Sequence, residues 1–268
     1  MIIDQQLSGP KTHHLRWWKE VLYALGFYLI YSFIRNQFGS AAVSEADALT
    51  NAKLIISIER AMGLFHEETL QEWFLSTRWF IQGWNIFYGS FHFVVTATAL
   101  IFLFRNQIHR YVRWRTTLAA TTGLALIGFA FFPLLPPRLL PESYGFVDTL
   151  SRFGGLWSFD SESMKAVSNQ YAAMPSLHFG WSTWSSLVLL PAIRQKWLRA
   201  LVIAYPIATL FAIVVTANHF WFDALGGAVV LGLGYSIGRW WDLRNLKDRV
   251  STVDHERVAS VVSGSRTG

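Results

Sequence analysis

Long stretches without charge alternate along the chain with short charged segments. No Asp, Glu, Lys or Arg occurs in the windows 79–104, 116–137, 166–193 and 200–222. Each window reaches the roughly 20 residues that a helix needs to cross a bilayer. Two shorter uncharged windows, 21–34 and 224–238, lie beside tryptophan pairs, which anchor helices at membrane surfaces. The pattern predicts an all-α polytopic membrane protein with about six transmembrane helices, near 17–36, 82–104, 116–135, 175–193, 198–217 and 220–241.

The first apolar segment has two interpretations. Basic residues before 21–34 and small residues at 39–42 behind it also fit a cleavable signal peptide. Trp17 and Trp18 favour a retained helix, because tryptophans at a helix end lie at the membrane interface. We therefore expect the first helix to be retained.

The connection between the first two helices is predicted to have structure of its own. Ser44 and Asp47 resemble a capping box, and apolar residues then recur at helical spacing up to Gly63, a C-cap candidate. We predict an amphipathic helix over 44–63 on the outer surface of the membrane. A shorter helix is expected to follow at 67–76.

The remaining boundaries follow from loop length and composition. The segment 136–174 is long and has no clear period, so it is a candidate lid over a bound substrate. We expect a single transmembrane catalytic domain at 1–249. Scattered charge and small residues at 250–268 predict a disordered cytoplasmic tail.

The composition agrees with a membrane protein. Of the 268 residues, 52% are hydrophobic and 15% are charged, whereas a soluble domain carries about 25% charged residues. The chain has no cysteine, which excludes disulfide bonds and thiol chemistry.

The net charge of +6 reflects where the cations lie. Lys and Arg gather in alternate connections of the six-helix arrangement, and the other connections hold most of the acids. Because cytoplasmic loops of membrane proteins are the basic ones, we expect both termini in the cytoplasm and a cell-membrane location. This distribution explains the basicity, so no nucleic-acid partner is expected. The clustered cations are Lys11, Arg16, Lys19, Arg105, Arg110, Arg113, Arg115, Arg194, Lys196, Arg199, Arg239, Arg244, Lys247 and Arg249.

Three ionisable residues are predicted to meet at the outer end of the bundle. The segment AAMPSLHFGWS places His178 at the start of the fourth helix, and TANHFWFDALGG places His219 and Asp223 at the same end. Ionisable groups at membrane depth are costly, so they indicate function. If helical, His219 and Asp223 share a face, and the carboxylate then orients the imidazole as a nucleophile or base. His178 supplies a second imidazole that can act as an acid.

A candidate anion site lies beside these residues. Pro175 and Ser176 open the fourth helix, whose first amides are unpaired and carry a partial positive charge. Arg138 follows a rigid Pro-Pro pair on the same side, and a guanidinium suits the oxygens of a phosphate. The whole set fits phosphoryl transfer without a metal or another cofactor.

Each feature also has a purely structural alternative. His178 could be a packed histidine, and His219 with Asp223 could be a structural pair. Arg138 could be an interfacial cation that reaches toward lipid head groups. Three mixed ligands at this spacing are weak evidence for a zinc site. The convergence of four features on one face favours catalysis.

At these residues the chain resembles the type-2 phosphatidic acid phosphatase superfamily. Pro175 to His178 read P-S-L-H where the family has P-S-G-H, and His219 with Asp223 match its H-x-x-x-D. The resemblance covers the predicted second to sixth helices. It implies that His219 forms a phosphohistidine, Asp223 orients it, His178 protonates the leaving oxygen and Ser176 contacts the phosphate.

The chain also departs from the family pattern. Ala212 and Ile213 stand where the family carries a Ser-Arg pair, so its phosphate-binding arginine is missing. The first motif lacks its standard form, and Arg138 in PLLPPRLLP is the candidate equivalent. These departures resemble the branch that contains fungal inositol phosphorylceramide synthase and its bacterial relatives. That branch moves a phosphorylated head group between lipids.

The stretch NIFYGSFHF on the second helix also resembles this branch. Asn85, Tyr88 and His92 lie on one helical face in its outer half. We expect this face to contact substrate; the alternative is an internal polar network that holds the helices together.

These observations predict a membrane-embedded lipid phosphotransferase that acts through a phosphohistidine. Its substrate would be a phospholipid or lipid phosphate of the outer leaflet, at an extracytoplasmic site. A lipid phosphate phosphatase, with water as acceptor, is the first alternative. A non-enzymatic transporter or binding protein with an intramembrane proton relay is the second. A vanadate-dependent haloperoxidase shares the wider fold, but the known kind is soluble and this chain is too apolar.

Overall fold

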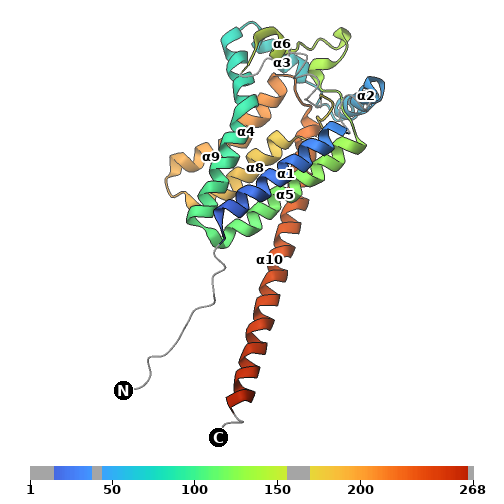
Figure 1. Cartoon of the computed structure of the whole chain (residues 1–268). Helices are drawn as coiled ribbons and strands as arrows, with labels where there is room; N and C mark the ends of the chain where they lie inside the picture. The colour runs from blue at the N-terminus through green and yellow to red at the C-terminus, as the bar shows by residue number, and fades with distance from the viewer. Residues whose placement is uncertain (1–14, 38–43, 156–169, 265–268) are drawn as a thin grey trace.

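The computed structural model describes residues 15–37, 44–155 and 170–264 of the chain. These residues form helices and short 3-10 turns, with an isolated β-bridge between Leu134 and Ala172 (Figure 1). The α-helices are α1 (Trp17–Gln37), α2 (Glu45–Ala61), α3 (Glu67–Leu75), α4 (Arg78–Asn106), α5 (Ile108–Phe131), α6 (Thr149–Phe153), α8 (Leu177–Leu189), α9 (Lys196–Val215) and α10 (Trp221–Gly264). The 3-10 turns are η1 (Pro137–Leu139), η2 (Glu142–Tyr144) and η3 (Leu190–Ala192).

Each segment that the sequence predicts to cross a membrane contains a helix: α1, α4, α5, α8, α9 and α10. Within the described ranges, three helical stretches are both long and apolar enough to span a bilayer: Arg78–Asn106, Lys196–Val215 and Trp221–Asn245. Helix α8 has 13 residues and extends about 20 Å, less than the roughly 30 Å of a hydrocarbon core. It gives way to the 3-10 turn η3 beside Pro191, which cannot donate a helical hydrogen bond. The arrangement with six spans stays a prediction.

Helix α10 continues well past the expected end of the catalytic domain. Its backbone is helical to Gly264, whereas the sequence suggested a disordered tail from residue 250. The stretch between Asp242 and Gly264 contains no proline and no other glycine, so nothing in it interrupts the helix. In Figure 1 this part of α10 projects away from the bundle. Residues 265–268 lie outside the described part.

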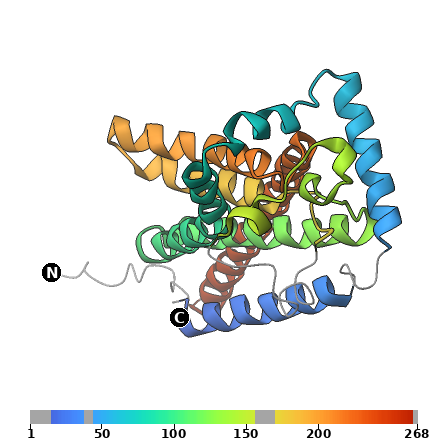
Figure 2. The same cartoon turned by 90° about the horizontal axis from the view of Figure 1, so that it is seen from above.

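The helices pack around α8. Helix α10 lies along α5 and α8, and α8 also packs against α4 and α9. Helix α1 lies along α5 on the side of the bundle, as Figure 2 shows. Helices α2, α3 and α6 gather at the end of the bundle where α10 begins (Figure 1). Residues that follow α5, precede α8 and precede α10 therefore meet beneath this cap.

Helix α2 forms where the capping pattern predicts it. The Ser44 side chain accepts a hydrogen bond from the Asp47 amide, and the chain leaves the helix through Gly63 at φ 68°. Its buried face contributes Ala52 and Ile55 to an apolar cluster that also contains Phe220, the residue before α10. Helix α2 is thereby fixed over the start of α10. Its place on a membrane surface stays a prediction.

Four glycines in the first half of α10 bring this helix close to its neighbours: Gly226, Gly227, Gly234 and Gly238. An added Cβ at Gly227 would overlap the carbonyl oxygen of Ser176, and one at Gly226 would crowd Pro175. An added Cβ at Gly234 or Gly238 would likewise overlap threonine side chains of α5. Small residues allow such close helix packing. Gly232 differs, because an added Cβ there would meet no atom within 4 Å.

Candidate active site

Two histidines and an aspartate form a hydrogen-bonded line where α8 and α10 begin. His219 Nδ1 lies 3.0 Å from Asp223 Oδ2. His219 Nε2 lies 3.4 Å from Nδ1 of His178, in the first turn of α8. Asp223 is fully buried and His219 nearly so. The segments that sequence reasoning placed at one end of the bundle are thus in direct contact.

The carboxylate of Asp223 determines which nitrogen of His219 carries the proton. The Asp223 carboxylate accepts a hydrogen bond from His219 Nδ1–H, which leaves Nε2 with a free electron pair. Nδ1 of His178 can then donate to this Nε2 across the 3.4 Å gap. Asp223 Oδ2 also accepts the amide of Phe220 at 3.0 Å, which fixes the carboxylate. The nitrogen that is free to react faces the second histidine.

His219 lies in a tight turn before α10, not on the helix itself. The amides of Asn218 and His219 both donate to the carbonyl of Ile213 at 3.0 Å. Ala217 has φ 54°, in the left-handed region that residues with a Cβ rarely adopt. Its carbonyl accepts the amide of Arg138 at 2.8 Å. This strained turn aims His219 back at the start of α8.

The start of α8 is held against α10. The Ser176 amide donates to the carbonyl of Asp223 at 2.8 Å. The Ser176 hydroxyl caps α8 by accepting from the Phe179 amide, at a long 3.5 Å. The side chain of Ser176 is fully buried. Because the first amides of a helix attract anions, this end of α8 provides partial positive charge beside both histidines.

Arg138 reaches the same region from the segment after α5. Its side chain is 10% exposed, and Nη1 donates to Asp148 Oδ2 at 2.9 Å. Asp148 also caps α6 by accepting the amides of Leu150 and Ser151. Arg138 Nε is buried without a hydrogen-bond partner among the described residues. The Arg138 guanidinium interacts electrostatically with the Tyr88 hydroxyl. Arg138 therefore retains an N–H donor that no described residue accepts.

The predicted polar face of α4 divides into two parts. The Tyr88 and His92 rings each lie 4.1 Å from the His178 ring, centroid to centroid. Asn85 instead holds the loop around α6, since its amide donates to the carbonyls of Thr149 and Gly154 at 2.9 and 2.8 Å. Tyr88 and His92 therefore line the histidine pair, while Asn85 positions the segment above it.

Sequence reasoning missed two acids that hold the first turn of α10. Glu59 Oε1 accepts the amide of Phe222 at 2.9 Å, and Glu67 Oε1 accepts that of Trp221 at 3.3 Å. With Asp223 on Phe220, three consecutive amides are bound by three carboxyl groups. Negative charge near the start of a helix is stabilising, because that end of the helix dipole is positive. The missed signal was the spacing of Glu59, which continues the buried face of α2 after Ala52, Ile55 and Ile56.

Glu59 and Glu67 are both fully buried and face each other. Burial, and next the neighbouring Glu67 carboxyl, raises the pKa of Glu59 to about 9. Within the described part of the chain, Oε2 of each has no partner outside the pair. We infer that the pair carries one proton at neutral pH, because two adjacent buried carboxylates repel each other.

The described residues contain no group of three or more His, Cys, Asp or Glu side chains arranged to hold a metal ion.

Comparison with known proteins adds one result. The family model of the PAP2 superfamily matches residues 53–237. The matched span contains His178, His219 and Asp223, together with Arg138 and Glu59. No curated protein and no solved structure matches the chain.

Proposed function

The chain belongs to the PAP2 superfamily, and from this premise we propose that it transfers a phosphorylated head group between lipids through a phosphohistidine. Membership indicates a phosphatase or phosphotransferase that acts on lipid phosphates. The candidate spans α4, α9 and Trp221–Asn245 of α10 indicate a membrane protein. The identity of the head group, such as inositol phosphate, belongs to the proposal.

One observation carries the proposal: the line from Asp223 through His219 to His178, with contacts of 3.0 and 3.4 Å. A carboxylate, an imidazole and a second imidazole in this order provide an orienter, a nucleophile and an acid. A structural ion pair would need no second imidazole opposite the reactive nitrogen.

In the first step, His219 Nε2 attacks the phosphorus of the donor lipid. A P–N bond forms as the bond between phosphorus and the leaving oxygen breaks. His178, as an imidazolium, gives one proton to that oxygen and becomes a neutral imidazole, so the donor departs as an alcohol. The negative charge of Asp223 stabilises the positive charge that develops on His219.

In the second step, the same groups act in reverse. His178, now unprotonated, takes the proton of an acceptor hydroxyl, and the oxygen attacks phosphorus as the P–N bond breaks. A lipid alcohol as acceptor gives a new phospholipid. Water would release the phosphorylated head group, or free phosphate when the donor is a lipid phosphate. We propose a lipid alcohol as acceptor. No metal takes part in either step.

The phosphate is held from two sides in this mechanism. The first amides of α8 behind Ser176 face it from one side. Arg138 offers Nε and its remaining N–H groups from the other, while Asp148 fixes the guanidinium. Arg138 thereby takes the place of the arginine that is missing near Ala212 and Ile213.

Tyr88 and His92 contact the substrate next to His178 in the proposal. Asn85 acts on substrate only through the loop that it holds. The segment 136–174 covers the site as a lid; its part at 156–169 lies outside the described residues.

The proposed topology has six spans, with α1, α5 and α8 completing the membrane domain beside α4, α9 and α10. Both termini lie in the cytoplasm, and the histidines open to the outer leaflet of the cell membrane. The cation pattern supports this orientation.

The experiment that tests the function uses purified full-length protein in detergent. Labelled phosphatidylinositol and a labelled lipid phosphate are each supplied with and without a lipid alcohol, and the products are separated. We expect new phospholipid, a trapped phosphoenzyme in wild type, and the same turnover after addition of a chelator. In His219→Ala both product and phosphoenzyme disappear, while the melting temperature changes little.

Three outcomes would contradict the proposal in different ways. Free phosphate without new phospholipid would make the protein a phosphatase. Retention of turnover in His219→Ala would exclude the phosphohistidine. The absence of any phosphoenzyme, together with substrate binding, would favour a transporter or binding protein.

A further inference from the structure

A cavity lies at the end of α8 opposite the histidine site. It has a volume of about 890 Å³ and is bordered by the α4–α5 turn, the second half of α8 and the middle of α10. On α8 the cavity begins at Thr183, five positions beyond His178. None of the residues that line it belongs to the histidine site, so the cavity is separate from the histidine pair.

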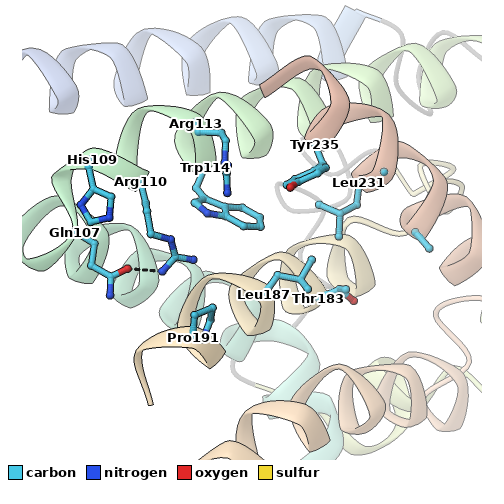
Figure 3. A pocket seen from close by; sticks show the side chains of 12 residues that line it. Gln107, His109, Arg110, Arg113, Trp114, Thr183, Leu187, Pro191, Leu231 and Tyr235 are labelled. Carbon is cyan, nitrogen blue, oxygen red and sulfur yellow. Dashed lines mark hydrogen bonds between the residues drawn. The ribbon is translucent and has the colours of Figure 1, made fainter. Parts of the chain in front are cut away.

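Basic side chains enter this cavity from α5. Figure 3 shows Arg110 and Arg113 on the same wall, with the Arg113 guanidinium beside Trp114 and Tyr235. The Arg113 guanidinium carbon lies 5.5 and 5.7 Å from these two ring centroids. Arg110 donates to the Gln107 side chain and to the carbonyl of Val188.

Among the described residues, the two guanidinium groups have no carboxylate as a counter-ion. Arg110 and Arg113 are close enough to repel each other. Across the described ranges neither forms an ion pair, whereas Arg115 on the same helix pairs with Glu20. Arg113 Nε is also buried without a hydrogen-bond partner among those residues. Partly buried positive charge of this kind favours an anionic ligand.

The rest of the cavity is apolar. Leu187 of α8 and Leu231 of α10 form its wall opposite the arginines (Figure 3). Gly232 leaves additional space, since no atom lies within 4 Å of an added Cβ. Leu231, Gly232 and Tyr235 belong to the part of α10 that is long and apolar enough to span a membrane, so this wall of the cavity is suited to hydrocarbon. A ligand here meets positive charge at one end and hydrocarbon along its length.

We propose that this cavity binds an anionic phospholipid, with its phosphate on Arg110 and Arg113 and an acyl chain along Leu187 and Leu231. Basic pockets between membrane helices are suited to acidic head groups. A soluble phosphate would leave the apolar wall unused, and a zwitterionic lipid would leave the guanidinium charge uncompensated. The site is distinct from the proposed reaction centre and does not depend on the reaction.

The test uses the purified full chain, stripped of lipid in detergent, and measures retained lipid by native mass spectrometry together with the melting temperature. The probes are phosphatidylglycerol and phosphatidylcholine with identical acyl chains, and glycerol phosphate. We expect one phosphatidylglycerol molecule to bind, with an affinity about tenfold higher than that of phosphatidylcholine. This difference corresponds to one additional charge-assisted contact. Glycerol phosphate produces no shift in melting temperature.

Matched variants assign the binding to the cavity. Arg113→Gln abolishes the preference for phosphatidylglycerol. Arg105→Gln removes the same charge from an exposed position at the end of α4, outside the cavity, and retains the preference. Gly232→Phe keeps both arginines but fills the cavity, and it lowers binding of both lipids. Because Gly232 has open space around it, this variant also tests the site if Arg113→Gln fails to fold.

Two results would overturn the proposal. Equal losses in Arg113→Gln and Arg105→Gln would show attraction to general surface charge. Unchanged phosphatidylglycerol binding in Gly232→Phe would place the lipid elsewhere. Because the assay measures no turnover, neither result bears on the proposed enzymatic function.

Discussion

The charged side chains at the two ends of α8 differ in their bonding partners. At the histidine end, Asp223, Glu59 and Glu67 each bind a backbone amide of the α10 start. At the cavity end, Arg110 and Arg113 have no carboxylate partner among the described residues. Hydrogen bonds at the histidine end hold the reactive groups still before substrate arrives, whereas uncompensated charge favours a bound ligand.

The largest effect is expected at the buried carboxylate of the histidine end. Asp223→Asn keeps the shape but replaces an acceptor for His219 Nδ1–H by an amide that can impose the wrong tautomer. We expect kcat to fall about 10³- to 10⁴-fold, as removal of such an orienter does elsewhere. Steady-state turnover of the labelled lipid measures this loss.

Asp242→Asn makes the same chemical change on the same helix, 19 positions further along. Turnover in this control should match wild type. Equal activity in Asp223→Asn and Asp242→Asn would remove Asp223 from the mechanism.

The next effect concerns the glycines of α10. Gly227→Ala pushes a methyl group into the Ser176 carbonyl and separates α8 from α10. We expect a loss of about 3 kcal/mol in unfolding free energy, the upper range for overpacking. Gly232→Ala, at the open end, should instead stabilise α10 by up to about 1 kcal/mol through helix propensity. Unfolding in mixed micelles measures both.

A similar cost for both alanine variants would contradict the difference in packing between the two ends. Loss of turnover should accompany the destabilisation in Gly227→Ala, because Ser176 directly precedes the turn that carries His178.

The smallest effect is the pH dependence that Glu59 introduces. Its pKa lies near 9 in the folded protein and near 4.5 when unperturbed. A raised folded-state pKa stabilises at low pH, and this contribution is lost as pH rises through about 9. The melting temperature should therefore fall between pH 7 and 9.

Glu59→Gln should flatten this part of the profile, because the amide stays neutral and still accepts from Phe222. Glu72→Gln, an exposed glutamate of α3, should leave the slope unchanged. The charged neighbours of Glu59 are Glu67 and Asp223, and neither changes in the two variants. A flat wild-type profile would contradict a protonated Glu59.

Local patterns predicted much of the fold. Uncharged windows located the helices, and Ser44 located the start of α2, because both signals act over a few neighbouring residues. The window around α8 did not reveal that the α-helix has 13 residues, since its apolar composition continues through Pro191.

The site was predictable only in part. The four-residue spacing suggested that His219 and Asp223 meet on a helix; they do meet, but His219 lies in the turn before α10. Ala217 in a left-handed conformation carries no sequence signal of that kind, because glycine is the usual residue there. The contact of Glu59 with Phe222 joins residues 163 positions apart, which periodicity within α2 does not reveal.

Helix α10 connects the two ends mechanically. Asp223 in its first turn and Leu231 at the cavity belong to one uninterrupted helix, and Gly227 presses against Ser176 between them. A rigid rod held at one point tilts as a lever. A tilt of α10 about the contact of Gly227 with Ser176 would therefore move Asp223 and Leu231 together.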